Sequence, residues 1–127
     1  MGNTLLVNTD LDAGKRILKT LDEANVRVDV AMWASLQEYG DARLILASRQ
    51  LDAMGLREAY GAVLRPLRNA GLSVEERGTF MILRMKDPFI RDLRRIFARA
   101  KSVAGMRLGG QVFGDRFIED AYVYRIS

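Results

Sequence analysis

Residues 28–36 read VDVAMWASL, and the alternation in this stretch decides the fold. Apolar side chains occupy every second position, as in a β-strand with one side turned toward a core. They are Val28, Val30, Met32, Ala34 and Leu36. The segment 37–41 then offers turn residues, and residues 42–47 form a second apolar run. We therefore predict a β-hairpin, with a helix through Ala31–Glu38 as the alternative.

Three amphipathic helices are predicted around this hairpin. The first covers residues 9–24 and begins with a capping box, in which Thr9 and Asp12 bond the main chain of the first turn. The second covers residues 52–70 and begins with a cap at Asp52. The third covers residues 87–103, because Asp87-Pro88 is a strong helix start and an apolar stripe follows it.

Three further strands are predicted, at residues 81–86, 111–113 and 116–126, with Gly114-Asp115 as a two-residue hairpin turn. The resulting order α-β-β-α-β-α-β-β predicts a single α+β domain over residues 1–127. We expect two layers, a mostly antiparallel sheet with about three helices packed on one face. If residues 5–7 add a strand in front, residues 4–86 read β-α-β-β-α-β, the ferredoxin-like order.

The chain contains no cysteine and no histidine among its 127 residues. Disulfides, thiolate nucleophiles, zinc sites of sulfur and imidazole, and serine–histidine–acid triads are therefore excluded. Catalysis would have to use carboxylates, Lys, Arg, Tyr, Ser or Thr. We expect no cofactor and no bound metal. No apolar run of about 18 residues and no secretion signal is visible, so we expect a cytoplasmic protein that enters no membrane.

Basic residues are concentrated in the second half of the chain. Residues 1–63 carry seven Lys or Arg against nine Asp or Glu, whereas residues 64–127 carry thirteen against seven. Most of the basic residues are Arg, which binds carboxylate and phosphate through paired hydrogen bonds. The densest group lies within residues 84–107. It consists of Arg84, Lys86, Arg91, Arg94, Arg95, Arg99, Lys101 and Arg107.

Within this group, Arg91, Arg95 and Arg99 lie four residues apart, opposite the apolar stripe of the third predicted helix. Such a surface favours an anionic partner, either nucleic acid or an acidic protein. The alternative is a solvated helix face without a ligand. Phe89 and Phe97 are predicted on the buried stripe, where they cannot stack on single-stranded bases. Our leading hypothesis is a non-catalytic binding module that uses this basic surface, with a homodimer as a candidate assembly.

Three carboxylates support a different hypothesis, an enzyme. Asp120 lies on the last predicted strand, on a face that carries large side chains, and an unpaired carboxylate there would be costly. These side chains are Ile118, Tyr122, Tyr124 and Ile126. Asp10, Asp12 or Asp120 would then be ligands in a metal-dependent phosphoesterase. An ion pair with an Arg of the neighbouring strand would equally account for Asp120, and helix capping for Asp10 and Asp12.

Trp33, Tyr122 and Tyr124 suggest a third hypothesis, a structural protein that forms homo-oligomers. Aromatic rings on an exposed sheet face would anchor a second copy of the chain. For Trp33, the only Trp of the chain, packing in the core is the alternative.

Overall fold

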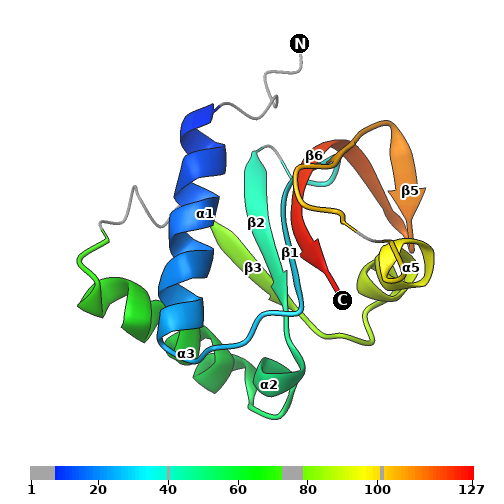
Figure 1. Cartoon of the computed structure of the whole chain (residues 1–127). Helices are drawn as coiled ribbons and strands as arrows, with labels where there is room; N and C mark the ends of the chain where they lie inside the picture. The colour runs from blue at the N-terminus through cyan, green and yellow to red at the C-terminus, as the bar shows by residue number, and fades with distance from the viewer. Residues whose placement is uncertain (1–7, 40, 73–78, 101) are drawn as a thin grey trace.

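The computed structural model describes residues 8–39, 41–72, 79–100 and 102–127, apart from the side chains of residues 8–10. Figure 1 shows one twisted sheet with helices on both sides. The helices are α1 (Asn8–Glu23), α2 (Arg49–Asp52), α3 (Leu56–Asn69) and α5 (Pro88–Phe97). The strands are β1 (Val30–Leu36), β2 (Ala42–Ala47), β3 (Phe80–Leu83), β4 (Arg107–Leu108), β5 (Gln111–Phe113) and β6 (Arg116–Ile126). None of these helices combines the length and the apolarity needed to cross a membrane.

The predicted β-hairpin of residues 28–47 is present at the centre of the sheet. β1 and β2 pair antiparallel, with Trp33 opposite Leu44. The strand order is β3-β2-β1-β6-β4, and β5 pairs with β6. Among the pairings of the described strands only that of β2 with β3 is parallel, which confirms the α+β class and the mostly antiparallel sheet.

The helices cover both faces of the sheet, whereas we predicted them on one face. α1 and α3 pack on the face that carries Ala31 and Trp33. α5 packs on the opposite face, which carries Val30 and Met32, and Figure 1 shows it across the sheet from α1 and α3. All seven residues of β1 are buried as a result. Both alternating sets of β1 side chains are predominantly apolar, so each face needs a cover.

The ferredoxin-like core is not confirmed. In that order the two strands joined by the second helix are separated by another strand, since the βαβ unit is split. Here α3 lies between β2 and β3, and these two strands pair directly, with Leu46 opposite Ile82. The strand suggested for residues 5–7 lies outside the described part of the chain.

Several element boundaries differ from the predictions. Asp52 does not cap α3; it ends α2, and its carboxylate accepts a hydrogen bond from the main-chain N–H of Met85 at 3.0 Å. α5 ends at Phe97 although the apolar stripe continues. Val103, at the end of the stripe, is buried but lies in a non-helical segment. The short strand β4 was not predicted. The Asp87 cap is confirmed, since its carboxylate accepts from the main-chain N–H of Phe89 at 2.9 Å.

Two irregularities in the pairing of β1 with β6 change which side chains of β6 share a face. The register shifts between Ala31 and Met32 and again between Ser35 and Leu36. Ile118 and Ile126 therefore join the core beneath α5, whereas Tyr122 and Tyr124 pack on the α1 side. The single face predicted for these residues is wrong, because each β-bulge reverses the alternation.

Candidate anion-binding surface

α5 is an amphipathic helix with a fully buried side. Phe89, Ile90 and Leu93 have no exposed surface and contribute to the core on that face of the sheet. The ring of Phe89 meets that of Phe113 edge-on, with centroids 6.4 Å apart. Because this side of the helix is fixed against the sheet, the opposite side projects into solvent.

The β5–β6 turn holds the first part of α5 in place. The main-chain N–H of Gly114 donates to the Asp92 carboxylate at 2.6 Å, and a side-chain N–H of Arg95 donates to the same carboxylate at 3.2 Å. These two bonds hold the pKa of Asp92 below its ordinary value, and the bond from Gly114 has the larger effect. Asp92 therefore remains an anion wherever the protein is folded near neutral pH.

Asp92→Asn is expected to change how stability depends on pH. Because the folded-state pKa is lowered, the contribution of this carboxylate is complete above the unfolded value of about 3.9 and is lost as the pH falls through the folded-state pKa. Unfolding by urea across acidic pH should show the variant losing less stability than the parent below that value. A stability difference between the two proteins that does not depend on pH would contradict this assignment.

Three arginines of α5 and one just after its end form what we call the arginine surface. Its members are Arg91, Arg94, Arg95 and Arg99, and with Ala98 they line a surface depression of about 570 Å³. Arg99 lies two residues beyond the end of α5 and still shares the depression. The small side chain of Ala98 leaves the space between the longer arginine side chains open.

The positive charge of the arginine surface is only partly compensated. Arg95 pairs with Asp92, and Nε of Arg94 donates to the main-chain oxygen of Ser127 at 2.9 Å. Arg91 and Arg99 are exposed and form no salt bridge with any residue that the structure describes. Among the described residues, the salt bridge of Arg95 with Asp92 is therefore the only one that involves these four guanidinium groups.

Three of the other four basic residues of the predicted group, Arg84, Lys86 and Arg107, do not join the arginine surface. Arg84 donates to the main-chain oxygen of Asp52 at 2.8 Å, and Lys86 is exposed ahead of α5. Arg107 lies on β4 opposite Tyr122, on the α1 side of the sheet. Lys101 lies outside the described residues. Of the seven described residues in this predicted group, the fold therefore brings four together.

Asp120 is paired with Arg107. Nη2 of Arg107 lies 2.8 Å from both carboxylate oxygens, and Asp120 is only 8% exposed. Asp12 is exposed on α1, and the side chain of Asp10 is not described. Among the described residues, no group of three or more carboxylates is placed to hold a metal ion. Of the two interpretations of Asp120, the structure therefore shows the ion pair with an Arg of the neighbouring strand.

Trp33 is part of the core and cannot contribute to an interface in this fold. Its side chain is buried beneath α1, where Gly14 faces it, and the residue is 4% exposed. Tyr124 donates to the main-chain oxygen of Leu11 at 2.6 Å, and its ring meets that of Tyr122 edge-on at 5.3 Å. The interface predicted from these rings is therefore corrected for Trp33, while Tyr122 and Tyr124 are half-buried against the same core.

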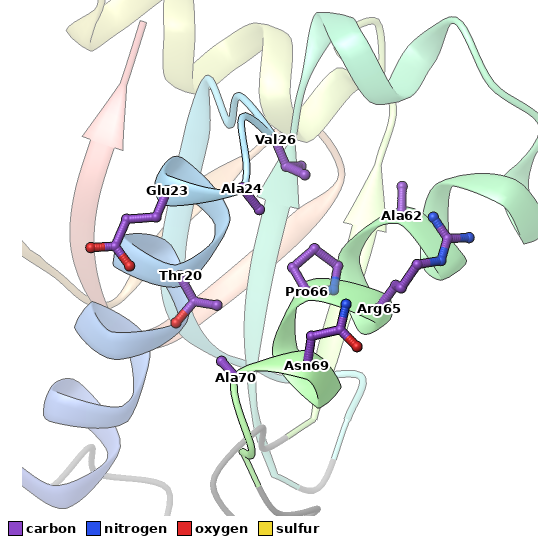
Figure 2. A pocket seen from close by; sticks show the side chains of 9 residues that line it. All are labelled: Thr20, Glu23, Ala24, Val26, Ala62, Arg65, Pro66, Asn69 and Ala70. Atoms are coloured by element: carbon purple, nitrogen blue, oxygen red, sulfur yellow. The ribbon is translucent and has the colours of Figure 1, made fainter.

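A groove of about 450 Å³ between α1 and α3 was not predicted from the sequence. Its lining is mostly small or weakly polar, with Thr20, Pro66 and Asn69 among the residues. Figure 2 shows its two charged side chains, Glu23 and Arg65, pointing away from each other toward opposite sides. A ligand site usually needs a few polar groups that converge on one point, and this groove has none that do so.

Comparison of the chain with protein-family models, with curated proteins and with solved structures finds no match.

Proposed function

We propose that the protein is a non-catalytic binding module whose arginine surface contacts an anionic macromolecule. The observation that carries this proposal is the shared depression of Arg91, Arg94, Arg95 and Arg99, in which Arg91 and Arg99 have no salt bridge to a described acid. Guanidinium groups bind carboxylates and phosphates through paired hydrogen bonds, so four of them in one depression suit such groups. We also propose that this module is located in the cytoplasm.

The spacing of the arginines also favours an anionic partner, because such a partner would relieve the repulsion between neighbouring positive charges. Arg91 and Arg95 are four residues apart on α5, a spacing at which like charges destabilise a helix by about 0.2–0.5 kcal/mol. Arginines near the C-terminal end also gain from the helix dipole, which offsets part of this cost. An anionic partner would remove the repulsion, whereas a symmetric homodimer through this surface would increase it.

The test compares two triple variants with equal charge. R91Q/R95Q/R99Q removes charge from the arginine surface, and R57Q/R65Q/R68Q removes the same charge from exposed positions of α3, across the sheet. Each variant lowers the formal net charge from +4 to +1. We expect the first variant to elute from heparin at clearly lower salt than the parent protein, and the α3 variant to elute close to the parent.

Equal elution of the two variants would contradict the proposal, because net charge alone would then explain retention. Retention of the R91Q/R95Q/R99Q variant at the parental salt concentration would contradict it as well. Circular dichroism of both variants checks that the fold is unchanged, as expected for exposed substitutions.

A further inference from the structure

We infer that the anionic partner is the phosphate backbone of a nucleic-acid duplex, bound without reading the base sequence. This inference rests on the proposed function of the arginine surface and names its partner. Three features of α5 and its surroundings support it: the absence of an exposed ring on the described part of α5, the lack of an apolar centre in the depression, and the kind of polar groups that the depression offers.

The exposed side of α5 offers no aromatic platform. Of its two aromatic residues, Phe89 is fully buried, and Phe97 is partly buried and packs on the ring of Phe113 with centroids 6.2 Å apart. Proteins that bind single strands stack the bases on exposed aromatic side chains. The arginine surface therefore suits a duplex, whose bases stay stacked inside, better than a single strand.

The depression also lacks the apolar centre of a protein–protein interface. Such interfaces place apolar and aromatic residues at the centre and charged residues at the rim. Here Ala98 is the only uncharged residue of the lining, and the exposed Ile96 lies outside it. Interfaces with nucleic acid are more polar and more positively charged, which matches this lining.

The geometry of α5 suits contact with several phosphates at once. Arg91 and Arg95 are separated along the helix axis by about 6 Å, at about 1.5 Å per residue. Duplex DNA presents about one negative charge per 1.7 Å of its axis, so every guanidinium group can reach a phosphate. The lining contains no Asn, Gln, Ser or Thr, so its arginines are the only side chains there that could contact a base edge, by pairing with guanine, and the same groups bind phosphates. Contacts with phosphates alone carry no sequence information.

The test measures affinity against salt for four probes. They are two DNA duplexes of unrelated sequence, a single strand of equal length, and polyglutamate as a model acidic protein. Between about 50 and 200 mM NaCl, we expect both duplexes to bind equally, with a slope of log K against log[salt] of about −3 to −4. The R91Q/R95Q/R99Q variant should have a slope near −1, since each lost phosphate contact reduces it by about one unit. The R57Q/R65Q/R68Q variant should keep the parental slope.

A second pair of variants tests the depression itself. Ala98→Glu places a carboxylate among the arginines, and Ala98→Gln adds a side chain of similar size without charge. We expect Ala98→Glu to weaken duplex binding about tenfold and Ala98→Gln to change it much less, because phosphate contacts respond to charge.

Tighter binding of polyglutamate or of the single strand than of the duplexes would overturn this inference, and so would a clear preference for one duplex sequence. If the parent protein bound heparin but neither duplex, this inference would be wrong while the proposed function would stand. If the parent protein bound neither heparin nor any of the four probes, the proposed function would be wrong as well.

Discussion

Gly114→Ala is expected to lower the free energy of unfolding by about 2–5 kcal/mol, the largest loss that we predict. Gly114 has a φ of +61°, a left-handed conformation that costs a residue with a Cβ about 1–2 kcal/mol. A Cβ at this position would also lie 2.6 Å from the main-chain nitrogen of Phe89 and 2.6 Å from the carbonyl carbon of Pro88. Main-chain atoms in the first turn of α5 cannot move aside independently, so the helix and the turn would have to separate.

Gly110→Ala is the matched control for this prediction. Gly110 also has a positive φ, +66°, but nothing lies within 4 Å of an added Cβ. We expect it to lose only the conformational term, about 1–2 kcal/mol. Urea unfolding of both variants measures the difference. Equal losses would show that the close approach of the turn to α5 contributes nothing to stability.

Gly14→Ala is expected to destabilise the protein by about 1–3 kcal/mol, although alanine favours helices. Inside α1 the substitution would gain about 1 kcal/mol from helix propensity. The added Cβ, however, would lie 2.6 Å from Cζ of Tyr124 and 2.7 Å from Nε1 of Trp33. The tyrosine ring would have to shift and lose its hydrogen bond to the oxygen of Leu11, which contributes about 1 kcal/mol. The steric term and the lost bond together exceed the gain.

The matched control has the opposite expected sign. Gly61 lies inside α3, and the nearest atom to an added Cβ is a guanidinium nitrogen of Arg65 at 3.9 Å. Gly61→Ala should therefore raise stability by about 0.5–1 kcal/mol. Thermal and urea unfolding of the two variants separate helix propensity from packing. A stabilised Gly14→Ala variant would mean that α1 can move away from Trp33 at little cost.

Short-range chemistry could be predicted from the sequence where a few neighbouring residues settle the local conformation. The cap of α5 needs only Asp87 and the main chain two residues later. The turn between β5 and β6 needs a residue that accepts a positive φ, and Gly114 supplies it. The alternation in β1 was sufficient for a strand, and its partner β2 follows after a short turn.

The same reasoning failed where an apolar stripe was taken as a sign of backbone conformation. Val103, at the end of the stripe of residues 89–103, is buried, but Ile96 and Ala100 within it are exposed, and α5 ends at Phe97. Asp52 has the side chain of a helix cap and instead binds Met85, 33 residues later in the chain. A side chain that can bond a nearby amide can equally bond a distant one, and packing decides between them.

The arginine surface was predictable because its members are close in sequence, on or beside a single helix. Arg107 was grouped with them on the same ground, yet it pairs with Asp120 through the neighbouring strands β4 and β6. The bond between Asp92 and Gly114 also joins residues that are far apart in the chain, so nothing near Asp92 indicates it.

Local patterns therefore established the strands of the central hairpin, the start of α5 and the charge of its exposed side. They could not assign helices to faces of the sheet. Both sets of β1 side chains are mostly apolar, Val30 with Met32 on one face and Ala31 with Trp33 on the other, so each face accepts a helix. Only the packed chain decides that α1 and α3 lie over Trp33 and α5 over Met32, because burial of a face depends on contacts between segments distant in sequence.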